Sequence, residues 1–372
     1  MPLRCLDDVG RSVLAWALSD EAWRELRQAN RQRQHLRMPC CDAQVVLRTS
    51  THGLRFFAHK ARSGCDWAPE SMPHLLAKLA IAKAASAQGW EVSTEYRDRT
   101  PEGEVWVADV FAQRGEARLA FEVQWSPQSL EETERRQAKY AASGVRGMWF
   151  MRDPPYREES HTLPLVWLQQ DDGLPPQVLV RGLARTAEPT ATQLYALPLE
   201  VFVTRALSGD YVFGPLLGKH VPVRLTGNFR PCQACGTWHR MVTSLRFMFS
   251  QVLPGFPTMG AALHDFETDS VLGQAVQAQL TSALCAKYKL GRMGALPYQK
   301  PVLWQYCQKC DAMLGRPSPG DKDELFGAIR VRMPARHDIP SERYALRPFM
   351  GHLGCWVLVG DSTQLRPVPG YL

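Results

Sequence analysis

The sequence predicts an α/β protein built on a mixed sheet with helices on its faces. A strong helical period follows Pro73, with apolar side chains recurring at helical spacing. Three β-rich runs come next, and the last two flank the turn Arg114-Gly115-Glu116 like a hairpin. A charged helix and a buried strand follow. Helix, three strands, helix, strand is the order of a compact α/β unit.

The elements of this unit can be placed along the chain. A helix is expected from Pro73 to the glycine at position 89, which ends it. In chain order the remaining elements are strands at 90–97, 105–113 and 118–125, a helix at about 127–142 and a strand at 145–151. Ahead of them, residues 11–37 read as a helix with a basic run. That run either contacts phosphates or is a solvated helix face.

Composition describes an ordinary globular chain. Of 372 residues, 45% are hydrophobic and 22% charged, and the formal net charge is +7. The positive charge permits an acidic partner such as nucleic acid without requiring one. No apolar run approaches the roughly 20 residues that span a bilayer, and the N-terminus MPLRCLDDVG lacks the apolar stretch of a signal peptide. We therefore expect a soluble cytoplasmic protein without membrane insertion.

Acidic residues lie on both strands of the expected hairpin. Asp109 is on the first strand and Glu122 on the second, and they share a face only if the loop has an even number of residues. Gln124 shares the face of Glu122 in any register. Two neighbouring carboxylates repel each other, and a hard cation such as Mg²⁺ removes that cost. The alternative is a half-exposed sheet whose polar residues face water.

Five motifs in this region resemble the competence protein CoiA family. They are FFAHK at 56–60, ES-x2-H-x3-K at 70–78, ADV at 108–110, EVQWS at 122–126 and E-x3-R-x4-Y at 131–140. The family resembles the PD-(D/E)XK nuclease superfamily, so the resemblance implies a restriction-endonuclease-like core. It also implies that Asp109 and Glu122 bind Mg²⁺ or Mn²⁺ and that Glu70 completes the metal or water shell.

The same resemblance places Gln124 where the superfamily usually has lysine. A lysine lends positive charge to the transition state, whereas glutamine only forms hydrogen bonds. Lys78 or Lys139, on neighbouring helices, could supply the missing charge. His74 and Lys78 share a helical face with Glu70, where they act either near the acids or as structural partners. Arg135 and Tyr140 are expected to pack or to contact phosphate.

Two C-x2-C pairs predict a zinc site in the second half of the chain. The pairs are Cys232 with Cys235 and Cys307 with Cys310. Together they supply four thiolates for a closed, structural zinc site. The insert between them is unusually long, so it either forms a helical insertion or leaves each pair to find other ligands, such as His239 or Cys285. Reduced cysteines without metal are the remaining alternative.

A second, weaker group of metal ligands lies near the N-terminus. Cys40, Cys41, His59 and Cys65 flank two short β-like runs around a Ser-Thr-His-Gly turn. The family resemblance suggests a small zinc-finger-like element there, with Cys40, His59 and Cys65 as Zn²⁺ ligands. Adjacent cysteines are awkward partners for one tetrahedral ion.

These features divide the chain into six expected segments. They are an N-terminal helical segment (1–37), a zinc-finger-like element (38–67), the nuclease-like core (68–153), a β-rich connecting region (154–230), a zinc-binding module with a long insertion (231–316) and a C-terminal tail (317–372).

Two functions are compatible with these features. The first is a Mg²⁺-dependent endo- or exodeoxyribonuclease linked to DNA uptake, recombination or defence, with catalytic residues Glu70, Asp109, Glu122 and Gln124. The second is a nuclease-fold accessory protein that binds DNA with little or no cleavage. DNA and recombination or uptake proteins are the expected partners, and the oligomeric state does not follow from the sequence.

Overall fold

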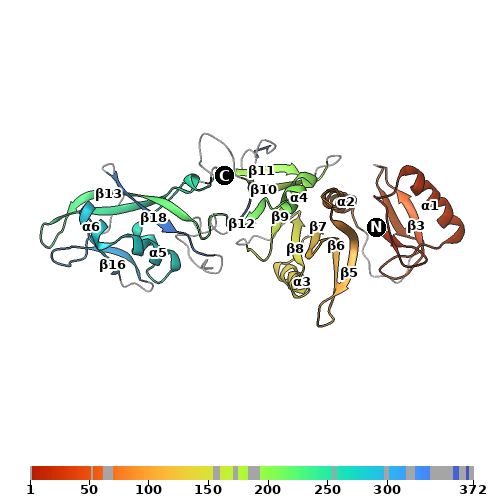
Figure 1. The fold of residues 1–372 in the computed structure, drawn as a ribbon, viewed down its shortest axis with the longest axis horizontal. Helices are drawn as coiled ribbons and strands as arrows, with labels where there is room; N and C mark the ends of the chain where they lie inside the picture. The colour runs from red at the N-terminus through yellow and green to blue at the C-terminus, as the bar shows by residue number, and fades with distance from the viewer. Residues whose placement is uncertain are drawn as a thin grey trace. The chain divides into compact units, whose positions relative to one another are not determined.

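The computed structural model (Figure 1) describes residues 2–51, 53–61, 70–153, 160–170, 175–182, 193–253, 256, 258–296, 301–315, 323–335, 355–359 and 366–367. The chain divides into two compact units. The first contains residues 1–180, 194–211 and 364–368, and the second contains residues 181–193, 212–363 and 369–372.

The first unit contains the α/β core in the predicted order. Its elements are α2 (Met72–Ala87), β5 (Glu91–Arg99), β6 (Val105–Arg114), β7 (Ala117–Gln124), α3 (Leu130–Ala142) and β8 (Arg146–Met151). The predicted mixed α/β architecture is therefore confirmed.

Local sequence signals set the bounds of the two helices. The Ser71 side chain accepts a hydrogen bond from the main-chain N–H of His74 at the start of α2, and Ser129 caps α3 in the same way. Gly89 follows α2 with a φ of 75°, a conformation that glycine adopts at little cost. These capping residues explain why both helices begin near the predicted positions.

The central sheet is mixed. In space its strands run β10-β9-β8-β7-β6-β5. The pairs β5–β6 and β6–β7 are antiparallel, whereas β7–β8 and β8–β9 are parallel. The additional strands are β9 (Leu165–Gln169), β10 (Gln177–Gly182), β11 (Gln193–Pro198) and β20 (Arg366–Pro367), and α4 spans Leu199–Leu207.

Helices cover both faces of this sheet (Figure 1). Trp149 of β8 meets Tyr140 of α3, whereas the next residue, Phe150, meets Phe202 of α4 edge to face. Because neighbouring residues of a strand point to opposite faces, α3 and α4 lie on opposite sides. Helix α2 packs beside α4. The hairpin acids thus lie in a sheet that is covered on both sides.

The N-terminal part of the first unit differs from its prediction. Residues 11–37 are not one helix, because β2 (Ser12–Leu14) pairs with β1 (Arg4–Leu6) before α1 (Asp20–Arg33) begins. Ser19 caps α1, and Gln34 ends it in the left-handed conformation. The strands β3 (Val45–Thr49) and β4 (Arg55–His59) form the expected hairpin.

The second unit is built on the sheet β15-β14-β13-β18. Its elements are β12 (Tyr211–Phe213), β13 (His220–Pro231), β14 (Trp238–Phe247), η1 (Phe249–Gln251), β15 (Met259–Ala261), η2 (Leu263–Asp265), α5 (Val271–Gln279), α6 (Ser282–Tyr288), β16 (Arg292–Leu296), β17 (Val302–Tyr306), β18 (Glu324–Arg332) and β19 (Trp356–Leu358). The insert between the cysteine pairs therefore contains strands as well as helices. In the parts of the chain that are described, no helix is long and apolar enough to span a membrane.

Candidate functional site

The β6–β7 hairpin fixes where the two predicted acids lie. Arg114 pairs with Ala117 across the two-residue turn Gly115-Glu116, so the loop has an even number of residues. The ladder runs back to the pair Val110–Phe121, which leaves Asp109 and Glu122 next on their strands. Beyond that pair the N–H of Val123 donates to Oδ2 of Asp109 at 2.9 Å. The Asp109 side chain thus occupies the point where the two strands stop pairing.

Asp109 lies next to two basic side chains of α2. Nε2 of His74 lies 3.3 Å from its Oδ2, and Nζ of Lys78 lies 3.6 Å from its Oδ1. Burial disfavours the charged carboxylate, but His74 and Lys78 outweigh this effect and hold the pKa of Asp109 well below its usual range. Asp109 is therefore ionised at neutral pH. Its side chain retains 18% exposure, so it is accessible to a ligand.

Lys78 is the centre of a buried charge cluster. Its side chain is fully buried, with Nζ 2.8 Å from Oε1 of Glu70 and 2.5 Å from Oε1 of Glu95. Burial disfavours the ammonium, yet Glu95, Asp109 and Glu70 together raise the pKa of Lys78 above its usual value. Three carboxylates thus share one lysine, and the cluster carries excess negative charge.

Glu95 is the member of this cluster that sequence reasoning missed. It lies on β5 with a φ of 48° and is only 4% exposed. Its Oε1 accepts a hydrogen bond from the N–H of Leu3, and its carbonyl oxygen accepts one from the guanidinium of Arg4. An isolated glutamate in a strand gives no sequence signal of such a role. Glu95 therefore joins the N-terminal strand to Lys78.

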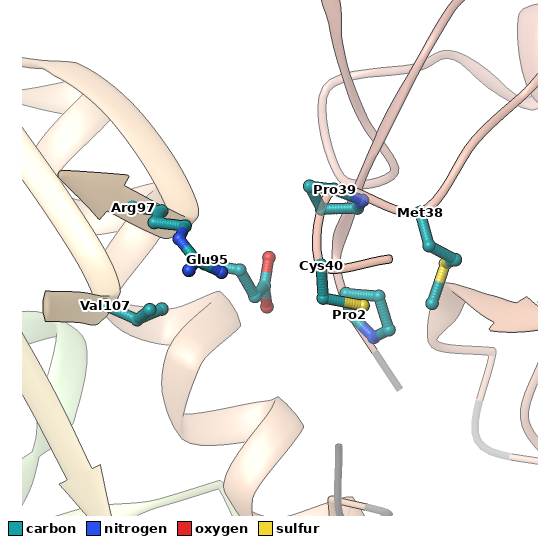
Figure 2. Close-up of a pocket in the computed structure, with 7 residues that line it drawn as sticks. All are labelled: Pro2, Met38, Pro39, Cys40, Glu95, Arg97 and Val107. Atoms are coloured by element: carbon teal, nitrogen blue, oxygen red, sulfur yellow. The ribbon is translucent and has the colours of Figure 1, made fainter. Parts of the chain in front are cut away.

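A small cavity borders Glu95. It is lined by Pro2, Met38, Pro39, Cys40, Glu95, Arg97 and Val107. Figure 2 shows the Glu95 carboxylate pointing from β5 toward Pro39 and Cys40. Its Oε2 is buried without a hydrogen-bond partner within the described part of the chain. The segment with the N-terminal cysteines thus borders the acidic cluster.

The carboxylate of Glu122 contacts α3. Its Oε2 lies 2.6 Å from the guanidinium of Arg136, and its Oε1 accepts a hydrogen bond from the Tyr140 hydroxyl. Glu122 is 1% exposed, and burial raises its pKa to about 8, with Arg136 opposing and Asp109 adding to the rise. The structure therefore gives Asp109 and Glu122 different partners, from α2 and α3 respectively.

The remaining predicted residues can be placed around this cluster. The Gln124 amide donates to the carbonyl oxygen of Ser126 at 2.8 Å. Lys139 pairs with Glu104, and Arg135 pairs with Glu132, so both contact acids outside the cluster. Of the two lysines considered from the sequence, Lys78 is the one that contacts the acids.

Three of these side chains have the geometry of a metal site. One potential ligand atom from each of Glu70, His74 and Asp109 lies within 4.8 Å of the others. Carboxylate oxygens suit Mg²⁺ and Mn²⁺, and a nitrogen ligand is compatible with Mn²⁺. The excess negative charge around Lys78 also favours a cation. The donor set therefore fits a hard divalent ion, and Glu122 is not part of this group.

The two C-x2-C pairs come together in the second unit. Sγ of Cys232 lies 3.7 Å from that of Cys310, and Sγ of Cys235 lies 3.5 Å from that of Cys307. Four thiolates around Zn²⁺ at about 2.3 Å are separated by about 3.8 Å. The four cysteines can thus hold zinc. Cys285 is buried elsewhere, in the main core of the unit.

The pKa values of two thiols in this cluster shift in opposite directions. A main-chain hydrogen bond from Ala312 lowers the pKa of Cys310, but its hydrogen bonds with the other thiols outweigh this effect and raise it. The neighbouring Thr237 lowers the pKa of Cys235 to about 6 through its side-chain and main-chain hydrogen bonds. Nε2 of His239 lies 3.1 Å from Sγ of Cys307. His239 therefore contacts one of the four thiols and lies beside the cluster as a hydrogen-bond partner.

Both knuckles share one backbone pattern. Cys232 donates its N–H to the carbonyl of Thr237 and accepts from the N–H of Gly236, which has a φ of 75°. Cys307 makes the same two bonds, with Ala312 and Asp311. Asp311 also has a positive φ, of 57°.

The same pattern recurs near the N-terminus with a methionine in the first cysteine position. Met38 donates its N–H to Ala43 and accepts from Asp42, whose φ is 57°. Cys41 therefore occupies the second cysteine position of a knuckle, and Cys40 lies between. Ligand atoms of Cys40, Cys41 and His59 lie within 4.8 Å of one another, so this group can also hold a metal. Cys65, the other expected ligand, lies outside the described residues.

Comparisons with known proteins bear on the first unit. Residues 70–170 match the family model described as "Competence protein CoiA, nuclease-like domain". No curated protein matches the chain significantly. A crystal structure of a protein of unknown function, AF1548, is similar with 17% identity and a TM-score of 0.20, over 24% of this chain and 56% of that one. The resemblance predicted from the motifs is therefore confirmed over residues 70–170, which match the nuclease-like domain of the competence protein CoiA family.

Proposed function

We propose that the protein is a metal-dependent DNA nuclease whose active site is the acidic cluster on α2, β5 and β6. The observation that supports this most strongly is that the carboxylates of three residues surround the buried ammonium of Lys78, and that His74 contacts one of them. The three are Glu70, Glu95 and Asp109. Burying this much unbalanced charge is costly unless a cation shares the site. The family of residues 70–170 supports a nuclease with a restriction-endonuclease-like core.

The chain's own residues would take distinct roles. Asp109 and Glu70 would hold Mg²⁺ or Mn²⁺, and His74 lies close enough to bind the same ion or an attached water. Lys78 supplies, from a helix, the positive charge that Gln124 cannot. When bound, the ion would polarise the phosphodiester and acidify a water molecule. Glu122 would lie beside this site as a carboxyl group covered by α3, where it contacts Arg136 and Tyr140.

A cleavage assay tests this proposal. Purified full-length protein would be incubated with single-stranded, double-stranded and branched DNA in Mg²⁺ or Mn²⁺. We expect cleavage that EDTA stops and that Asp109→Ala strongly reduces. Absence of cleavage on every substrate with both ions would reject the enzymatic proposal.

A second candidate is a DNA-binding accessory protein on a nuclease fold. It is favoured because two of the expected catalytic side chains already have partners within the protein. Glu122 contacts Arg136 and Tyr140, and the Gln124 amide donates to the Ser126 carbonyl. Binding that persists in EDTA and in Asp109→Ala, without cleavage by the wild-type protein, would select this alternative. Either activity fits DNA uptake, recombination or defence. The cysteine clusters would serve as structural Zn²⁺ sites in both cases.

A further inference from the structure

The sheet of the second unit has one apolar face and one arginine-rich face. Along β13, β14 and β18, alternate residues are buried in the core of the unit, including Val223, Leu225, Phe247, Ile329 and Val331. The positions between them point the other way. They include Arg224, Arg246, Arg330 and Arg332, all exposed, which we call the arginine face.

Strand register gathers these four side chains. Arg224 pairs directly with Arg246 across β13 and β14. On the other side of β13, Arg330 pairs with Pro222 and Arg332 with His220. Neighbouring strands lie about 4.8 Å apart, and alternate residues of one strand about 6.7 Å apart. The four guanidinium groups therefore occupy one continuous area across three strands.

Among the described residues, no acidic side chain pairs with this area. None of the four arginines makes an ion pair or side-chain hydrogen bond within the described part of the chain. No Asp or Glu occurs anywhere from position 211 to position 264. The acid of β18, Glu324, pairs across from Gly227 beyond the arginines and lies near Arg240.

Such an arrangement is unfavourable by itself. Like charges directly opposite each other on adjacent strands, such as those of Arg224 and Arg246, destabilise a sheet. An ordinary solvated face interleaves both signs, which removes that cost. A polyanion lying across the strands would remove it too, because arginine forms paired hydrogen bonds with phosphate.

We propose that the arginine face binds the phosphate backbone of DNA. The choice of DNA among polyanions rests on the proposed function of the first unit. Contacts of this kind position a nucleic acid without reading its bases, so the face would contribute affinity and little sequence preference. The second unit would thus hold the substrate of the nuclease-like domain.

Salt-dependent binding of the full-length protein tests this proposal. Fluorescence anisotropy would measure the affinity for a labelled DNA duplex and for its single strand. The Arg224→Gln/Arg330→Gln variant would be compared with Lys287→Gln/Lys289→Gln, which removes two exposed cations on and after α6. Thermal unfolding and zinc content would establish that both variants are folded.

We expect the arginine variant to bind DNA about tenfold or more weakly at about 0.1 M salt, and the slope of log K against log salt to fall by about two. The lysine variant should match the wild type. Unchanged affinity and slope in the arginine variant would overturn the proposal. So would arginine-dependent binding to anionic phospholipid vesicles by a protein that does not bind DNA.

The outcome is separable from that of the nuclease proposal. A protein that cleaves no DNA but binds it through the arginine face would reject the enzyme and retain this inference. If the wild type and the arginine variant cleave DNA with the same KM and salt dependence, the nuclease proposal is retained and the arginine-face proposal is rejected.

Discussion

The ammonium of Lys78 lies 2.5 Å from the carboxylate of Glu95, and both side chains are almost completely removed from solvent. Glu70 and Asp109 contact the same ammonium. A fully buried lysine that holds three carboxylates together couples the stability of the first unit to its proposed chemistry. Substitutions in this cluster should therefore change both the free energy of unfolding and the cleavage rate, and each change can be measured separately.

Lys78→Met should lower the free energy of unfolding by about 3–5 kcal/mol, because it leaves buried carboxylates without their counter-charge. Denaturant unfolding followed by circular dichroism measures this change. Lys83→Met, an exposed position on the same helix, is the matched control and should stay within about 0.5 kcal/mol of the wild type. Equal stability of the two variants would show that the buried charges are balanced in another way.

Glu122 should make the stability of the first unit depend on pH. Its pKa is raised to about 8 in the folded protein, so the folded state binds a proton that the unfolded state releases near pH 4.5. Its contribution to stability is therefore full below about pH 4.5 and is lost as pH rises through about 8. Unfolding free energies measured across this range, without added divalent ions, test the sign.

Glu122→Gln is the variant that isolates this effect. It should flatten the decline of stability with pH relative to the wild type, whereas Glu131→Gln, on the first turn of α3, should leave the decline unchanged. A wild-type curve that rises from pH 5 to pH 8 in step with the variant would contradict the assignment.

Zinc content should report the four-cysteine cluster of the second unit. Cys307→Ser removes one of its thiolates and should lower bound zinc by about one equivalent per chain, measured by elemental analysis. Cys5→Ser, a buried thiol outside both clusters, should retain the wild-type content. Full zinc retention in the Cys307 variant would show that the cluster does not bind it.

Met38→Cys should strengthen metal binding at the N-terminal knuckle. The substitution restores a thiolate at the position that cysteine occupies in the two other knuckles. Chelator competition measures the affinity, and Met38→Leu should leave it unchanged because zinc in proteins is held by Cys, His and Asp or Glu side chains. Equal affinities of the Cys and Leu variants would mean that the Met38 side chain points away from the ions.

The sequence predicts the core well because its signals are local. The helical period and the turn at Gly115-Glu116 act within a few residues, as do the capping serines Ser71 and Ser129 that the structure shows. The even length of the turn was left open by the sequence and comes from the structure. The site depends on longer-range packing. The meeting of Glu95 with Lys78 requires β5 to lie against α2, and the contacts of Glu122 require α3 to cover β7.

The N-terminal helix and the knuckles show the same limit. The apolar residues Val13 and Leu14 continue a helical pattern, but pairing of Cys5 with Val13 places them in a hairpin instead. The knuckle at Met38 is invisible to a C-x2-C search, because backbone hydrogen bonds define it and its first cysteine is absent. Strand pairing determines the fold of the first segment, and backbone hydrogen bonds determine that of the second.

The most direct test of the central claim is the DNA cleavage rate of the wild-type protein beside that of Asp109→Asn, with Mg²⁺ and with Mn²⁺. Glu91→Gln, an exposed acid on β5, is the matched control. We predict metal-dependent cleavage by wild type and control, and a loss of at least about a hundredfold in Asp109→Asn. Equal cleavage by Asp109→Asn and wild type would contradict an active site at Asp109.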